Sequence, residues 1–182
     1  MSKRYKARNS NAIYFITVTI IDWIDLFSRP IYKHIITDSL NHCVQNKGLI
    51  IHAYVIMSNH IHCIVSTTED QELQYVMRDF KKFTSYEIIK TMKNIHESRS
   101  EWVLDKFSFS AKKSVRNTFY KVWQEGYHPI ELNQNHLIDQ KLNYIHNNPI
   151  RSEYVFKPEE YKFSSASDYN GIKGLVDIVL IE

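Results

Sequence analysis

Residues 49–65 constrain the fold of this chain more than any other stretch. Two runs rich in β-branched and aromatic residues, 49–57 and 60–65, are separated only by Ser58 and Asn59. Runs of this composition are typical of β-strands, and a connection of two residues joins antiparallel neighbours, because parallel strands need a long crossover. The segment therefore predicts an antiparallel hairpin.

The second strand of this hairpin carries two histidines at alternate positions. Because side chains alternate between the faces of a strand, His60 and His62 are expected to project from the same face. Ile61, Cys63 and Val65 would then point the other way, into a core. Two imidazoles placed in this way lie close enough to share a metal ion. The alternative is a pair of hydrogen-bonded or exposed histidines on a half-buried strand, with no ligand role.

The segments on either side of the hairpin predict the fold class. Residues 13–21 have strand composition, and Pro30 stands at the first turn of a helix expected to reach Asn46. After the hairpin, residues 68–71 resemble a capping box, and apolar residues at helical spacing extend a second helix to about residue 93. This order predicts an α+β, ferredoxin-like (RRM-like) antiparallel sheet with both helices on one face. The other face, with His60 and His62, would stay open for a ligand.

The second half of the chain is less regular. A basic, Ser-rich piece lies within residues 95–118, where we expect an excursion with a mobile loop. Asn135 is expected to cap a helix over residues 136–147, which Pro149 would end. Residues 158–166 are interpreted as a turn followed by a packed segment. We find no internal repeat and no second domain, so residues 1–182 are expected to form a single domain.

Composition limits the possible environments of the protein. With 182 residues the chain can build a real core, and only 4 glycines and 4 prolines argue against long linkers. The formal net charge of +3 is compatible with nucleic acid but is no evidence for it. Cys43 and Cys63 form no disulfide framework, so a cytoplasmic location is expected. Residues 13–21 are too short to span a bilayer, and no membrane association is expected.

Tyr144 is the candidate nucleophile. It lies near the end of the predicted helix 136–147, four residues before Asn148, so the two would share a helix face. A tyrosine beside a metal site can act as a nucleophile when a nearby cation or base helps it to ionise. Asn148 could give the metal an oxygen ligand, although the residue before a proline is biased away from helical dihedrals. The alternative for Tyr144 is a packed interfacial residue.

Clusters of cations mark candidate DNA contacts, with a solvated face as the alternative. Phosphate contacts combined with aromatic stacking are typical of proteins that bind single strands. The candidates are Arg78, Lys81 and Lys82 on the second helix; Lys112, Lys113 and Arg116 beside Phe107, Phe109 and Phe119; and Lys3, Arg4, Lys6 and Arg8 at the N-terminus.

Four segments together resemble the single-tyrosine HUH transposases of the insertion-sequence and REP-associated type. Residues 57–65 resemble the HUH motif, 144–151 the tyrosine motif and 161–166 the segment that follows it, while 123–132 is similar to a block of the REP-associated branch. The segments occur in family order over nearly the whole chain. Ser58 stands where the family usually has proline, which we expect to change the stiffness of the turn more than the chemistry.

The resemblance implies a metal-dependent endonuclease and strand transferase. It implies that His60 and His62 bind Mg²⁺ or Mn²⁺, and that Tyr144 attacks a phosphate of single-stranded or hairpin DNA. The products would be a 5′-phosphotyrosine and a free 3′-OH. Asn148 matches the position at which related enzymes place a third metal ligand, often Gln. A homodimer, associated with the nucleoid when bound to DNA, is also implied.

Three other functions stay open at this point. A domesticated protein would bind or nick chromosomal repeat hairpins without mobilising itself, and only genomic context separates it from a transposase. A nucleic-acid-binding module without catalysis would fail a nicking assay. A hydrolase that uses His60 and His62 with an activated water would form no covalent protein–DNA adduct.

Overall fold

The fold is built on an antiparallel sheet, as the hairpin pattern predicts. The computed structural model describes residues 12–95, 97–113 and 119–181. The sheet has the strand order β2-β3-β1-β4. Its strands are β1 (Tyr14–Thr19), β2 (Leu49–Ile56), β3 (His60–Thr67) and β4 (Ile130–Glu131). This order, with the chain sequence β-α-β-β-α-β, is the ferredoxin-like arrangement, and the predicted α+β class is confirmed.

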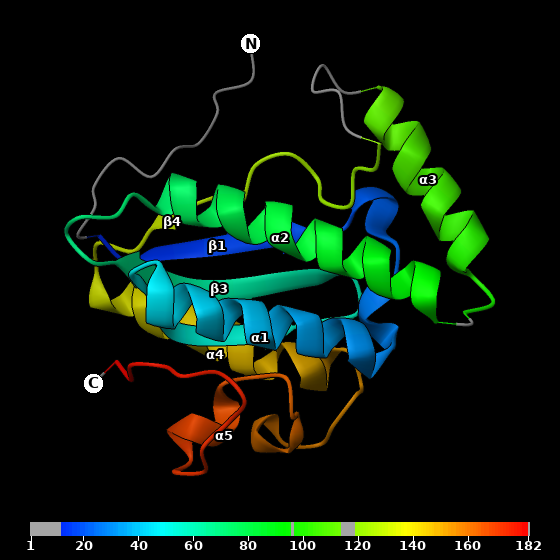
Figure 1. Ribbon diagram of the computed structural model, residues 1–182. Helices are drawn as coiled ribbons and strands as arrows, with labels where there is room; N and C mark the ends of the chain where they lie inside the picture. The colour runs from blue at the N-terminus through cyan, green and yellow to red at the C-terminus, as the bar shows by residue number, and fades with distance from the viewer. Residues whose placement is uncertain (1–11, 96, 114–118, 182) are drawn as a thin grey trace.

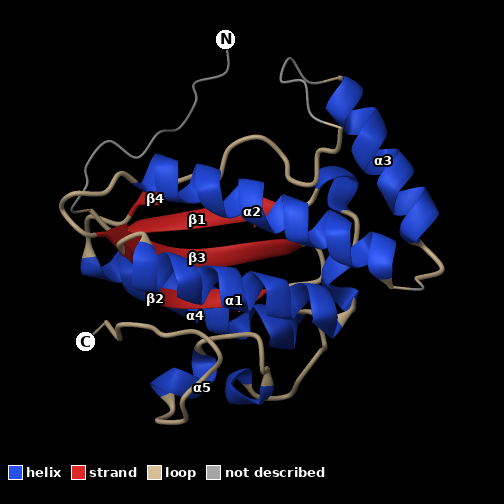
Figure 2. Cartoon of the chain, viewed as in Figure 1, coloured by secondary structure: helices blue, strands red, loops and turns tan. Residues whose placement is uncertain are grey.

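The helices lie on both sides of this sheet. They are α1 (Pro30–Asn46), α2 (Leu73–Asn94), α3 (Ser100–Lys112), α4 (Asn135–Arg151) and α5 (Ala166–Tyr169). Figure 1 shows α1 and α2 in front of the sheet and α4 behind it, and Figure 2 shows the same layers by type. None of the helices in the described part of the chain is long and apolar enough to span a bilayer.

The apolar side chains of strands and helices form one core. The core contains the buried residues on one face of β1 and β3 together with buried residues of α1 and α2. Examples are Ile16, Cys63, Ile36, Leu40 and Phe80. Since the histidines occupy the alternate positions of β3, this core leaves them on the other face of the sheet.

The hairpin between β2 and β3 follows the prediction closely. Ser58 and Asn59 connect the strands, and the backbone N–H of Met57 donates to the carbonyl of His60 at 2.8 Å. The register pairs Ile56 with Ile61 beyond this turn. The observed strand ends differ from the expected ones by one or two residues, which is ordinary for such boundaries.

Three helix boundaries differ from the prediction. Asn135 does not cap α4 but is its first residue, and Gln134 occupies the N-cap position without a side-chain hydrogen bond. Residues 68–71 form a turn, in which the N–H of Gln71 donates to the carbonyl of Thr68, and α2 begins only at Leu73. Pro149 does not end α4, which runs on to Arg151. Pro149 lacks the N–H that would continue the helix ladder, and its ring crowds the carbonyl of the residue four positions earlier. The backbone bonding nevertheless continues after it, since Ser152 N–H donates to the Asn148 carbonyl.

Helix α3 occupies most of the region in which an irregular excursion was expected. One side of it is buried through Val103, Phe107 and Ala111, which accounts for a helix where no clean periodicity was visible. Figure 1 shows α3 at the end of α2, away from the middle of the sheet. Residues 96 and 114–118 lie outside the described residues, and the mobility of a loop in this region stays a prediction.

Residues 161–166 cover the free edge of β2. The N–H of Ile56 donates to the carbonyl of Phe163, and the N–H of Ser165 donates to the carbonyl of Tyr54. Lys33 of α1 fastens the segment further, because its ammonium group donates to the Tyr161 hydroxyl at 2.7 Å. An edge strand protected in this way is closed to pairing with another chain.

Candidate active site

The fold brings His60, His62 and Tyr144 together. The two imidazole ring centres lie 4.6 Å apart on β3. The Tyr144 hydroxyl on α4 lies 3.5 Å from Nε2 of His62, and their ring centres are 5.2 Å apart. The three side chains named from the sequence therefore lie within one chain as one cluster. The face they occupy is not open as expected, because α4 packs over β2 and β3 and leaves His62 only 7% exposed.

Neighbouring oxygens fix the orientation of both imidazoles. Nδ1 of His60 lies 2.6 Å from the side-chain oxygen of Asn59, which only accepts, so this nitrogen carries the proton. Nδ1 of His62 lies 2.9 Å from the Thr17 hydroxyl. With Nδ1–H donating to that hydroxyl, Nε2 of His62 keeps a lone pair directed towards Tyr144. Partners of this kind orient histidine ligands and raise their basicity in metal sites.

Burial keeps both histidines neutral at ordinary pH. Burial first, and then the electrostatic effects of His60 and Lys141, together lower the pKa of His62 to about 3. Burial also lowers the pKa of His60. A neutral imidazole is the form that binds a metal, so the ion need not displace a proton from either ring near pH 7.

A metal ion at this site would need ligands besides the two histidines. The described residues contain no cluster of three or more His, Cys, Asp or Glu side chains suited to a metal. Asn148 is buried one turn beyond Tyr144, and among the described contacts its amide makes no hydrogen bond to either histidine. Oxygens of Asn148, water or a DNA phosphate could complete a shell. Two imidazoles with oxygen ligands suit Mn²⁺ better than Mg²⁺, which strongly prefers oxygen.

Sequence reasoning missed several residues that surround the cluster. Phe15 stacks on His62 with ring centres 5.2 Å apart and meets Tyr144 edge-on at 6.1 Å. The Lys141 ammonium and the Arg151 guanidinium each lie 5.7 Å from the centre of the Tyr144 ring. The signal was available in part, because residues three before and seven after Tyr144 share its helix face. The contact of Phe15 with His62 could not be predicted locally, because it depends on the pairing of β1 with β3.

The predicted cations of α2 lie on a different side of the molecule. Helix α2 covers the face of the sheet opposite α4 (Figure 1). Arg78 is 63% exposed and forms an ion pair with Asp79 at 2.8 Å, while Lys82 is exposed. Lys81 donates to the backbone carbonyls of Gln124 and Gly126 at 2.6 and 2.7 Å. The Lys81 ammonium therefore holds the loop that runs beside β1.

The second predicted cluster lies at the C-terminal end of α3. Lys112 and Lys113 are exposed there, and the Lys113 ammonium lies 4.1 Å from the centre of the Phe109 ring. Arg116 and the N-terminal cations lie outside the described residues. Lys113 and Phe109 are both exposed and in contact, so a charge and an aromatic surface lie side by side as the sequence predicted.

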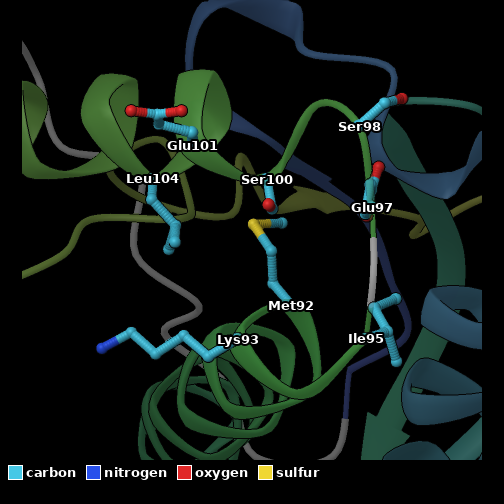
Figure 3. Close-up of a pocket in the computed structure, with 8 residues that line it drawn as sticks. All are labelled: Met92, Lys93, Ile95, Glu97, Ser98, Ser100, Glu101 and Leu104. Atoms are coloured by element: carbon cyan, nitrogen blue, oxygen red, sulfur yellow. The ribbon is translucent and has the colours of Figure 1, made fainter.

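A separate cavity lies away from the histidine cluster, where the surrounding contacts are structural. It has a volume of about 640 Å³ and lies between the end of α2 and the start of α3 (Figure 3). Its lining contains neither histidine of the cluster nor Tyr144. The buried Glu97 carboxylate at its wall accepts from the Tyr32 hydroxyl and pairs with Arg29 and Arg99. These bonds tie α1 to the connection between α2 and α3.

Two solved structures are similar to this chain. A solved structure of a REP-associated tyrosine transposase bound to a REP hairpin is similar over 100% of this chain and 96% of its own length. Its TM-score is 0.68, at 15% identity. A putative transposase from Deinococcus radiodurans R1 matches 80% of this chain and 97% of its own, with a TM-score of 0.47 and 14% identity.

Sequence comparison then places the chain in a family. No curated protein sequence is significantly similar to it. Residues 10–119, more than half of the chain, match the family model described as "Transposase IS200 like". This match contains the β2–β3 hairpin with its two histidines. The chain therefore belongs to the IS200-like transposase family and has a transposase-like role in DNA processing.

Proposed function

We propose that this protein is a metal-dependent single-strand DNA endonuclease and strand transferase that works through a 5′-phosphotyrosine. One observation carries the proposal. The Tyr144 hydroxyl lies 3.5 Å from Nε2 of His62, and the ring of His60 lies alongside. A nucleophile thus stands beside two neutral imidazoles that can hold a divalent ion, Mg²⁺ or Mn²⁺.

The residues around the histidines prepare them to bind an ion. In the tautomer that carries the proton on Nδ1 of each ring, Thr17 and Asn59 accept from Nδ1–H and both Nε2 lone pairs are available. Phe15 covers one side of the His62 ring and limits its rotation. A bound divalent ion would offset the negative charge that develops on the scissile phosphate. Asn148 is the proposed third protein ligand.

Tyr144 carries out the covalent step. Its phenol oxygen forms a bond to phosphorus, the bond from phosphorus to the 3′ oxygen breaks, and the 3′ oxygen takes up a proton. The phenol proton passes to solvent. The charges of Lys141 and Arg151 each lie 5.7 Å from the centre of the Tyr144 ring, where they attract the phosphate. The strand is rejoined when a 3′-OH attacks the phosphotyrosine and releases Tyr144.

The substrate that we propose is single-stranded or hairpin DNA. The relative that matches this chain over its full length was solved with a REP hairpin. The exposed Lys112 and Lys113 offer phosphate contacts at the C-terminal end of α3, and Arg78 and Lys82 offer them on α2. Because Tyr144 contacts His62 of the same chain, one chain contains the whole cluster. The homodimer stays a prediction.

The test is the formation of a covalent adduct. The protein is incubated with labelled single-stranded hairpin DNA and Mn²⁺, and products that resist denaturant are separated by size. We expect an adduct with the wild type and none with Tyr144→Phe, which keeps the ring and its packing. Tyr154→Phe, at an exposed tyrosine outside the cluster, is the matched control and should form the adduct normally.

Other outcomes of this experiment separate the alternatives. Cleavage without an adduct, unaffected by Tyr144→Phe, would indicate a hydrolase in which His60 and His62 activate water. Binding without cleavage under any metal would indicate a nucleic-acid-binding module. An adduct that peptide mapping assigns to Tyr127 or Tyr161 would mean that Tyr144 is not the nucleophile.

A further inference from the structure

A strained turn stands directly beside the histidine pair. In the short 3₁₀ turn Ile21–Trp23, Asp22 has φ 51° and Trp23 has φ 55°. Both values lie in the left-handed region, which glycine enters freely and which a residue as bulky as Trp rarely adopts. Strain of this kind persists where the surrounding structure enforces it, and it is found most often at functional sites.

The strained backbone presents the Trp23 ring to solvent next to His60. The side chain is 58% exposed, although its ring centre lies only 6.1 Å from that of His60, at 72° between the planes. Asn59 holds this arrangement from both ends. Its amide nitrogen donates to the Trp23 carbonyl at 3.2 Å, and its oxygen accepts from His60 Nδ1. The same residue thus orients a candidate metal ligand and an exposed aromatic ring.

A cleft of about 340 Å³ begins at Asp22, the residue before Trp23, and extends to the C-terminal end of α3. This volume lies within the range of small-ligand pockets. Lys113 and Lys121 contribute two positive charges to its lining, and Asp22 and Glu125 contribute two negative ones. A balanced lining does not favour a phosphate group. The exposed Phe109 ring and the polar side chains suit the flat face and the hydrogen-bonding edge of a nucleobase.

We propose that Trp23 is a stacking platform for an unpaired nucleobase next to the phosphate that Tyr144 attacks, with the cleft at Asp22 receiving the neighbouring base. This inference rests on the proposed function, because it takes His60 and His62 to mark the position of that phosphate. Stacking on an exposed ring fixes the strand without reading its sequence, since every base has an aromatic face. Trp23 is therefore a substrate-positioning residue.

The experiment measures binding without chemistry. The protein carries Tyr144→Phe, the buffer contains EDTA, and the probes are a fluorescently labelled oligothymidine strand and a blunt hairpin without a single-stranded extension. Fluorescence anisotropy gives the affinity, and tryptophan emission reports contact with the ring. We expect oligothymidine to quench the emission, Trp23→Ala to weaken its binding about tenfold, and Trp23→Phe to restore most of the affinity while abolishing the quench. Binding of the blunt hairpin should not change.

Trp102→Phe is the matched control, because Trp102 is also half exposed but lies on α3 and lines neither the cleft nor the cluster. It should retain both affinity and quenching. If Trp23→Ala binds oligothymidine as tightly as its parent, or if the quench survives in Trp23→Phe, the platform does not exist. Since no cleavage is measured, a failure of the proposed function leaves this result interpretable. Conversely, the wild type could form the adduct while Trp23→Ala binds oligothymidine as tightly as its parent. That pair of results would support the proposed function and refute only the role of Trp23.

Discussion

The Thr17 hydroxyl is expected to control metal affinity without touching the metal. In Thr17→Val the side chain keeps its shape, but Nδ1–H of His62 loses the acceptor that lies at 2.9 Å. The ring is 7% exposed, so water does not readily replace that acceptor. A buried donor left without a partner costs about 1–3 kcal/mol.

The His62 ring can avoid this cost by moving its proton to Nε2, the nitrogen that faces Tyr144. Metal binding must then return the proton to Nδ1 and meet the same cost. With about 1.4 kcal/mol for each factor of ten, the dissociation constant should rise roughly 5- to 140-fold. This agrees with the usual effect of losing a partner of a histidine ligand. The free energy of unfolding should change by less than about 1 kcal/mol, because valine suits a strand.

Isothermal titration of the metal-free protein with Mn²⁺ measures this affinity, and nitrogen NMR of the imidazoles reports which nitrogen carries the proton. Thr19→Val is the matched control. Thr19 lies opposite His60 in the register of β1 and β3, but His60 already has Asn59 as its partner. Its affinity for Mn²⁺ should stay within about twofold of the wild type. Equal affinities of Thr17→Val and Thr19→Val would refute the argument.

Three further predictions concern stability. Burial lowers the pKa of His146 to about 4 and that of His62 to about 3, whereas unfolded histidines titrate near 6.5; the unfolded chain therefore binds more protons in acid. Urea unfolding should show stability falling from pH 7 to pH 5 by about 2 kcal/mol per histidine, and His146→Gln should remove its share, while an unchanged slope would contradict this assignment. Lys81→Met should lower the free energy of unfolding by about 1–3 kcal/mol and leave the salt slope of DNA binding at its wild-type value, whereas Lys82→Met should reduce that slope by about one; a reduction of about one in Lys81→Met would place Lys81 on a phosphate instead. Trp23→Gly should be more stable than Trp23→Ala by about 1 kcal/mol in thermal or urea unfolding, because only glycine relieves the left-handed backbone, and the reverse order would argue against strain.

Local patterns were sufficient for much of the fold. The alternation along β3 and the short turn at Ser58 and Asn59 predicted the hairpin, because both depend on neighbouring residues alone. The helix from Pro30 to Asn46 was predicted with its observed ends. The errors came where tertiary contacts outweigh local signals. Pro149 lies within a helix held by packing, and α3 is stabilised by burial of one side rather than by a clear sequence period.

The candidate site divides along the same line. The sequence by itself determined that His60 and His62 share a face and that Tyr144 and Asn148 share another, since strand and helix periods fix such relations. Only the tertiary structure decided that α4 crosses the sheet so that Tyr144 meets His62, and that Thr17 holds His62 in its orientation. The tertiary structure also bonded the Lys81 ammonium to the backbone carbonyls of Gln124 and Gly126, and it bent the chain so that Trp23 is exposed. These relations join residues far apart in sequence, and no local period encodes distances set by the packing of separate elements.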